Sequence, residues 1–211
     1  YAITFGQFGG FTYPPYDEFW PKELRAPNTE TLLPAKYNTQ LRMEQARNFV
    51  WGIQPTIVNY HAFARKARPV EMKYIAELVA KRKQYKDYMQ YGKMMRAPKL
   101  ANNYATEIEI AQMSTYSYKN EGTNLFPHKK VVPLLYSSAW RNKEGNILLA
   151  FTNISEEAKD MAFTINPTEM GLDENFTLYI DGGVAQNGVP QSKYEVVIKG
   201  CSTKIFEFKK E

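Results

Sequence analysis

The sequence predicts an α+β chain of two parts, a partial (β/α) barrel segment over residues 1–104 and an antiparallel β-sandwich over residues 105–211. Strand and helix patterns alternate in the first part, as in proteins with parallel sheets. Short strands separated by turn residues fill the second part, as in sandwiches. Two strands and two helices cannot cover a parallel sheet on both faces. Either strands of the second part complete the sheet, or the first part carries only the last two strand–helix units of a barrel; we favour the latter.

The first part begins with an apolar, β-prone segment at residues 1–5, followed by a proline-rich loop of roughly 30 residues. Asn38 or Thr39 is suited to cap a helix from about residue 40 to Val50, which Gly52 ends. A second strand is expected at residues 55–60. Pro69 then opens a long helix, which ends before Pro98.

The second part shows the period-two alternation and the turn residues of short antiparallel strands. Arg141 to Gly145 carries a hairpin signal, and further turns are expected at residues 181–183 and 187–188. The expected strands lie at residues 107–113, 131–140, 146–153, 160–165, 176–180, 194–198 and 203–208.

Composition narrows the function classes. Of 211 residues, 44% are hydrophobic and 23% charged, which is ordinary for a globular protein. The net charge of +5 is spread out and no nucleic-acid-binding module accompanies it, so we expect no nucleic acid partner. No apolar run is long enough for a membrane span. Cys201 is the single cysteine, and no metal or cofactor motif is present, so we expect neither a metal nor a cofactor.

The segment from Trp51 to His61 is the most informative part of the chain. In a barrel, ligands are met at the carboxyl ends of the strands. The expected strand at residues 55–60 ends on Asn59, Tyr60 and His61, whose amide, phenol and imidazole groups suit sugar hydroxyls. Trp51 just before this strand offers a ring on which a sugar can stack. The alternative is that these side chains are buried structural residues.

Three more residues complete the candidate sugar site. Gln7 follows the first expected strand and occupies the matching position at its end. Tyr16 and Trp20 lie in the aromatic loop after it, beside an Asp–Glu pair. Their rings suit stacking on sugars, while packing beneath the loop is the competing explanation.

The segments 1–6 and 45–60 resemble the end of a (β/α)8 barrel from an uncharacterised glycoside hydrolase family of the Bacteroides type. Ser138 to Trp140 and Gly145 to Ile154 resemble the sandwich that follows such barrels. The resemblance implies hydrolysis of poly- or oligosaccharides by two carboxylates, with the remainder of the barrel as a partner and a periplasmic or extracellular location. In related clans these carboxylates lie on earlier strands, so this chain alone is expected to lack the complete pair, and no catalytic residue is assigned.

Three functions remain open from the sequence. The first is the C-terminal portion of a glycoside hydrolase, supplying substrate-binding residues and an accessory sandwich. The second is a non-catalytic carbohydrate-binding or adhesion module. The third is a structural domain whose exposed aromatic residues contact another subunit. The strand–helix units favour the first function, because a free-standing binding sandwich does not need them.

Overall fold

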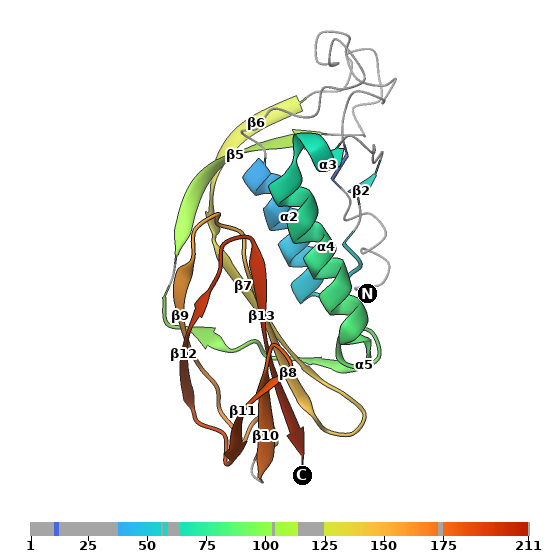
Figure 1. The fold of residues 1–211 in the computed structure, drawn as a ribbon. Helices are drawn as coiled ribbons and strands as arrows, with labels where there is room; N and C mark the ends of the chain where they lie inside the picture. Colours follow the sequence, from blue (N-terminus) through green and yellow to red (C-terminus); the bar gives the residue numbers. More distant parts are fainter. Residues whose placement is uncertain are drawn as a thin grey trace.

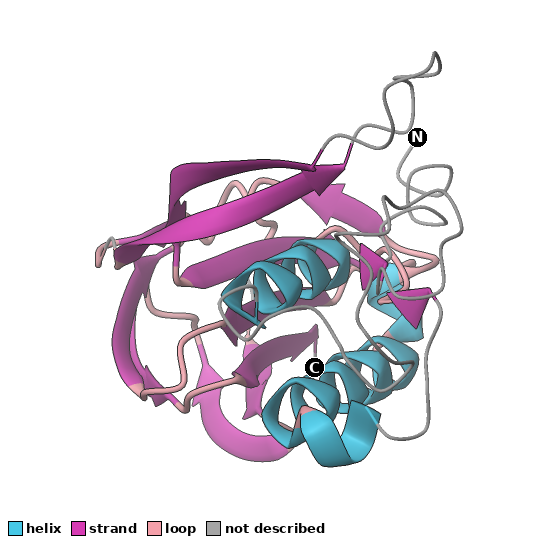
Figure 2. Ribbon diagram, turned by 90° about the horizontal axis from the view of Figure 1, so that it is seen from above, coloured by secondary structure: helices cyan, strands magenta, loops and turns pink. Residues whose placement is uncertain are grey.

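A computed structural model describes residues 11–12, 38–55, 57–58, 64–102, 104–113, 125–172 and 175–210. Two long helices cover one face of a six-stranded sheet, and a three-stranded sheet covers the other face (Figure 1). Figure 2 shows the same helices from above, lying side by side against the strands. The described part is therefore a layered β-rich structure with helices on one side.

Its helices are α2 (Asn38–Val50), α3 (Ala64–Ala67), α4 (Pro69–Gln84) and α5 (Lys86–Met89). The six-stranded sheet has the order β11 (Gly183–Gly188), β10 (Phe176–Ile180), β13 (Ser202–Lys210), β8 (Ile147–Asn153), β7 (Leu135–Arg141) and β3 (Lys93–Met95). The three-stranded sheet has the order β12 (Lys193–Ile198), β9 (Lys159–Thr164) and β4 (Lys99–Leu100). Two separate pairs are β5 (Ala105–Met113) with β6 (Leu125–Pro133), and β1 (Phe11–Thr12) with β2 (Ile57–Val58).

The β1–β2 pair is parallel, with Phe11 opposite Ile57 and Thr12 opposite Val58. Helix α2 lies in the sequence between these two strands, as a parallel pair requires a crossover connection. β2 falls within the strand expected at residues 55–60, whereas the strand expected at residues 1–5 lies outside the described residues.

Helices α2 and α4 run in the same direction, as two contacts between them show. Arg42 in the first turns of α2 contacts Glu71 in the first turn of α4. Near the other ends, the Arg82 side chain of α4 donates a hydrogen bond to the Gly52 carbonyl, just after α2. Helices α2 and α4 are therefore parallel to each other, and each comes after one strand of the parallel pair in the sequence.

Helix α2 ends as the sequence predicts. Gly52 has a φ of 70°, its N–H donates to the Phe49 carbonyl, and the Ile53 N–H donates to the Asn48 carbonyl. These two bonds form the Schellman motif, in which glycine supplies the left-handed residue. A Cβ atom at Gly52 would lie 2.4 Å from the Met89 carbonyl oxygen and 2.8 Å from the Trp140 ring. Glycine is therefore needed here both for its backbone conformation and for the close contact with α5 and β7.

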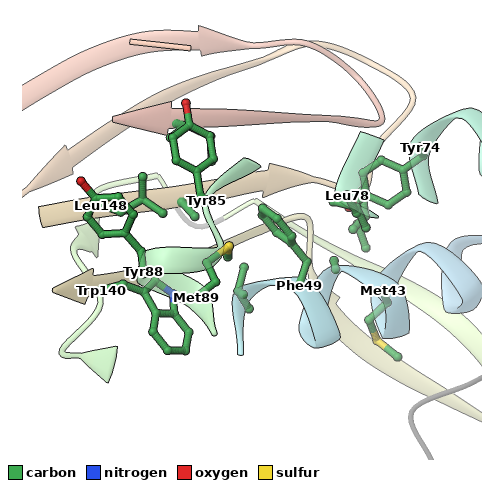
Figure 3. Packing of buried hydrophobic residues seen from close by; sticks show 14 of the residues in the cluster. Met43, Phe49, Tyr74, Leu78, Tyr85, Tyr88, Met89, Trp140 and Leu148 are labelled. Atoms are coloured by element: carbon green, nitrogen blue, oxygen red, sulfur yellow. The ribbon is translucent and has the colours of Figure 1, made fainter. Parts of the chain in front are cut away.

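Strand β8 is the centre of the fold, because all seven of its residues are buried. Leu148 and Ala150 face the helices and share a cluster with Phe49, Tyr74 and Leu78 of α2 and α4 (Figure 3). The alternate residues of β8 belong to a second cluster between the two sheets. That cluster includes Ile147, Leu149, Phe151, Phe163 and Phe206. The helices and the sandwich consequently pack against opposite faces of one sheet.

The antiparallel sandwich expected from the sequence is present, with some differences in its strands. Residues 131–140 do not form one strand but belong to β6 and β7, which pair with different partners. Turns were expected on both sides of β11 but no strand between them, because β11 is exposed, has a glycine at each end and shows little hydrophobic alternation. The sequence prediction also missed β3 and β4, which are too short for a period-two signal and pair with β7 and β9. Strand pairing of the sandwich thus begins ahead of residue 105.

Within the described segments, no helix combines the length and the hydropathy that crossing a lipid bilayer requires.

Candidate functional site

One of the seven residues predicted to bind sugar, Trp51, lies in the described part of the chain. The other six, Gln7, Tyr16, Trp20, Asn59, Tyr60 and His61, lie outside the described residues. Their convergence on one site remains a prediction.

Trp51 is held at the surface by the end of helix α2. Its N–H donates to the Arg47 carbonyl at 3.1 Å, and its side chain is 45% exposed. The Arg47 guanidinium carbon lies 5.0 Å from the centre of the Trp51 ring, which is the geometry of a cation–π contact. One face of the indole is therefore covered by a cation on its own helix.

Arg82 near the end of α4 contacts the segment that follows Trp51. The Arg82 Nε donates to the Gly52 carbonyl oxygen at 2.9 Å, and its Nη1 lies 3.5 Å from Gln54 Oε1. Burial lowers the pKa of the Arg82 guanidinium, while nearby Tyr91 opposes that shift. Tyr91 is itself 57% exposed. An exposed indole with amide and guanidinium groups beside it is able to stack on a sugar ring and donate to its hydroxyls.

This Trp51 surface lies at the amino end of β2, because Trp51 precedes the strand. Asn59 directly follows Val58 in the sequence. In a (β/α) barrel the carboxyl ends of the strands carry the ligand site, and the opposite face serves stability. Because Trp51 precedes β2 in the sequence whereas Asn59, Tyr60 and His61 follow it, we expect Trp51 at the opposite end of the strand from these three residues.

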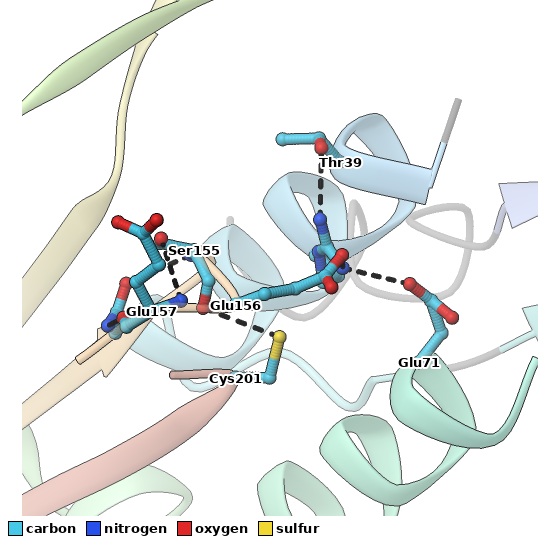
Figure 4. Close-up of polar contacts among 8 residues, drawn as sticks. Thr39, Glu71, Ser155, Glu156, Glu157 and Cys201 are labelled. Atoms are coloured by element: carbon cyan, nitrogen blue, oxygen red, sulfur yellow. Dashed lines mark hydrogen bonds and ion pairs between the residues drawn. The ribbon is translucent and has the colours of Figure 1, made fainter. Parts of the chain in front are cut away.

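A buried ionic cluster lies at the other end of the helix pair (Figure 4). The Arg42 Nη1 contacts Glu71 Oε1 at 2.9 Å and Glu156 Oε1 at 2.7 Å, and its Nη2 donates to Thr39 Oγ1 at 3.0 Å. The side chains of Arg42 and Glu71 are 5% and 4% exposed, whereas that of Glu156 is 64% exposed. The cluster connects α2, α4 and the turn between β8 and β9.

Sequence reasoning missed Arg42 and Glu71, although a signal for them is present. Arg42 lies four and seven residues before Ala46 and Phe49, and Glu71 lies four and seven residues before Ile75 and Leu78. Each charge thus occupies a position on the apolar face of its helix. A cation and an anion on the apolar faces of consecutive helices predict a buried pair, since an unpaired buried charge is very costly.

Cys201 is adjacent to this cluster and is half-buried. Its backbone has a φ of 45°, its N–H donates to the Ser155 carbonyl oxygen at 2.7 Å, and its Sγ lies 3.4 Å from the same oxygen. Burial raises the pKa of the thiol, the charge of Arg42 opposes this rise, and the charges of Glu156 and Glu71 add to it. A thiol with a raised pKa is a poor nucleophile.

Two other carboxylates, Glu77 and Glu207, accept hydrogen bonds that join the helices to β13. Glu77 accepts bonds from the N–H and Oγ1 of Thr203 at 2.7 and 2.6 Å. Glu207 accepts from the Tyr88 hydroxyl at 2.9 Å, and burial raises the pKa of that phenol, which keeps it a donor. These contacts fix α4 and α5 on β13. Among the residues that the structure describes, no group of three His, Cys, Asp or Glu side chains is arranged to hold a metal ion.

Comparison with known proteins gives no family. No family model matches the chain, and no curated protein matches it. The similar solved structures are glycoside hydrolases. They include a GH27 β-L-arabinopyranosidase from Geobacillus stearothermophilus in complex with arabinose, with 14% identity over 37% of this chain and a TM-score of 0.30. A GH30 endoxylanase from Clostridium papyrosolvens C71 shows 14% identity over 41% of this chain and a TM-score of 0.28.

An α-amylase from Geobacillus thermoleovorans, complexed with acarbose, aligns with 82% of this chain at 7% identity and a TM-score of 0.40. The chain spans 18%, 23% and 34% of the lengths of these three proteins. At these TM-scores the likeness establishes neither the fold nor the activity of this chain.

Proposed function

We propose that this chain is the C-terminal portion of a glycoside hydrolase that acts on poly- or oligosaccharides. Residues 1–104 would supply the last two strand–helix units of a (β/α)8 barrel, and residues 105–211 its accessory sandwich. Gln7, Tyr16, Trp20 and the Asn59–His61 strand end would contribute to the substrate site. The catalytic carboxylates are left unassigned, and a periplasmic or extracellular location belongs to the same proposal.

The observation that carries this proposal is the parallel pairing of β1 with β2 across helix α2. A parallel pair needs helices on its faces and further strands at its edges, because parallel sheets are buried on both sides. Helices α2 and α4 are parallel to each other, as consecutive strand–helix units require. Phe49 of α2 and Tyr74 and Leu78 of α4 also pack against the six-stranded sheet, which connects these helices to the sandwich.

The test is turnover by the product of the complete reading frame on a panel of plant, algal and animal polysaccharides. We expect release of reducing sugar from at least one class. His61→Ala and Trp20→Ala should each lower kcat/KM by about tenfold or more, the size of one lost sugar hydrogen bond or stacking contact. Trp51→Ala is the matched control and should leave kcat/KM near that of the parent.

Binding without turnover would contradict hydrolysis and favour the non-catalytic carbohydrate-binding module. Absence of both binding and turnover across the panel would contradict any role in carbohydrate recognition. Loss of kcat/KM in Trp51→Ala, with none in His61→Ala, would place the substrate at the opposite end of the strands and remove the barrel assignment.

A further inference from the structure

A hollow of about 400 Å³ opens on the sandwich where the segment from Lys93 to Lys99 crosses from β3 to β4. Its other wall is the segment from Thr164 to Met170. We refer to this feature as the basic hollow. Its volume lies within the range of small-ligand sites.

The basic hollow is lined by buried apolar residues and by exposed polar residues. Pro98, Ile165 and Met170 are buried, and Met94 is 45% exposed. Thr164 and Asn166 are exposed and present a hydroxyl and an amide. A concave apolar surface with a few polar groups at its edge is the usual form of a ligand site.

Positive charge dominates this edge. Lys93, Arg96 and Lys99 all line the hollow and are all exposed, against the single carboxylate of Glu169. Within the described residues, none of the three cations forms an ion pair or a side-chain hydrogen bond. Like charges brought together without a partner repel one another and attract an anion to the cleft that they line.

A fourth cation, Arg141, contacts Met170 in the wall of the hollow. Arg141 is the partner of Lys93 across β3 and β7, and its Nη2 donates to the Met170 carbonyl oxygen at 2.8 Å. Its Nε is buried and has no hydrogen-bond partner among the described residues. This half-buried guanidinium adds positive potential next to two residues that line the hollow, Lys93 and Met170.

We propose that the basic hollow binds an oligosaccharide carrying carboxylate or sulfate groups, an inference that rests on the proposed glycoside hydrolase function. The three cations would receive the acidic groups, and the Met94 and Pro98 side chains would contact the apolar face of the sugar ring. The hollow is a binding site for an acidic polysaccharide chain outside the barrel. Its role is to hold the polymer while the barrel acts on it.

The experiment is titration calorimetry of the full chain with tetragalacturonate, a heparin-derived tetrasaccharide, neutral cellotetraose and the tetranucleotide dT4. The variant Lys93→Ala/Arg96→Ala/Lys99→Ala removes the cations of the hollow. The control Lys73→Ala/Lys83→Ala/Lys86→Ala removes the same charge from exposed positions of α4 and α5. All six residues are exposed, so both variants should keep the parent's thermal midpoint.

We expect at least one acidic tetrasaccharide to bind about tenfold or more tightly than cellotetraose and dT4. The variant of the hollow should bind this tetrasaccharide about tenfold more weakly than the parent, because three weak surface contacts together contribute about a tenfold change in affinity. The control variant should bind it less than about twofold more weakly. Equal losses in both variants would show a general charge effect and overturn the proposal. Equal binding of dT4 would overturn the saccharide assignment.

The results of this experiment distinguish failure of the basic hollow as a binding site from failure of the proposed hydrolase function. Acidic tetrasaccharide binding that depends on Lys93, Arg96 and Lys99 would stand even where the complete protein releases no sugar. Conversely, hydrolysis of neutral polysaccharides with no acidic tetrasaccharide bound would leave the enzyme proposal intact and remove the basic hollow as a site.

Discussion

The Arg42 guanidinium binds two carboxylates of unequal exposure through the same nitrogen. Glu71 is buried, so removing its charge leaves Arg42 with less compensation in the core. We expect Glu71→Gln to lower the free energy of unfolding by about 3 kcal/mol, within the range for breaking a buried pair. Glu156→Gln is the matched control and should cost less than about 1 kcal/mol, because that side chain is 64% exposed. Urea unfolding measures both, and equal losses would contradict a buried role for Glu71.

The carboxyl group of Glu44 should make the free energy of unfolding depend on pH. Burial raises the pKa of its carboxyl, and the hydrogen bond from Gln40 and the charge of Arg47 offset only part of that rise. A carboxyl that binds its proton more tightly in the folded state makes the protein less stable as pH rises through the raised pKa. Glu44→Gln should therefore increase the free energy of unfolding at neutral pH and leave it nearly unchanged at about pH 4. The same change at both pH values would contradict the raised pKa.

For single residues, the sequence predicted the backbone conformation at helix ends better than it predicted which side chains contact each other. The roles of Gly52 and Pro69 were predictable because they depend on the local backbone alone. Gly52 adopts the left-handed conformation that ends α2, and Pro69 lacks the N–H that the first turn of α4 does not need. The Arg42–Glu71 pair joins residues 29 apart in sequence, so it follows only from the packing of two helices. The hollow between β3 and β9 likewise depends on strands that are distant in the chain.

Among the helices and strands, β8 is the one whose burial on both faces is best predicted by its own sequence. Residues 147–151 form an uninterrupted apolar run, which fits a strand covered on both faces. The structure shows what the sequence could not, namely that helices cover one face and a second sheet the other. Helix α2 was predictable from its cap and apolar positions, whereas β3, β4 and β11 are too short or too exposed to carry a pattern.

Adjacent leucines in β8 test whether the layers fold as one unit. Leu148 faces the helices and Leu149 faces the second sheet, and both are fully buried. We expect Leu148→Ala and Leu149→Ala each to cost about 2–5 kcal/mol and to unfold in one transition. Val197→Ala, at a side chain that is 56% exposed, should cost less than about 0.5 kcal/mol. Two separate transitions in Leu148→Ala, followed by circular dichroism and tryptophan fluorescence, would contradict a shared sheet.

On the scale of the whole molecule, the sequence predicted strand–helix units followed by an antiparallel sandwich, and the described residues form mostly antiparallel sheets with few helices. Hydrophobic period and turn residues are local, so they identify the two kinds of architecture. They do not determine how the two are joined, which depends on the apolar faces of α2 and α4 meeting Leu148 and Ala150 of β8. The sugar site could be predicted only as a set of residue types near strand ends, because the sequence does not determine which of these side chains lie together.

The parallel pairing of β1 with β2 is the geometry on which the barrel and the proposed hydrolase both depend. Double-cysteine trapping in a Cys201→Ser background tests it directly. In the parallel register Phe11 opposes Ile57, whereas an antiparallel pair would set Phe11 opposite Val58. Disulfides form when the two Cα atoms lie about 4.4–6.8 Å apart. After mild oxidation, mass spectrometry should find the cross-link in Phe11→Cys/Ile57→Cys and little in Phe11→Cys/Val58→Cys; the reverse result would contradict the parallel unit and the barrel with it.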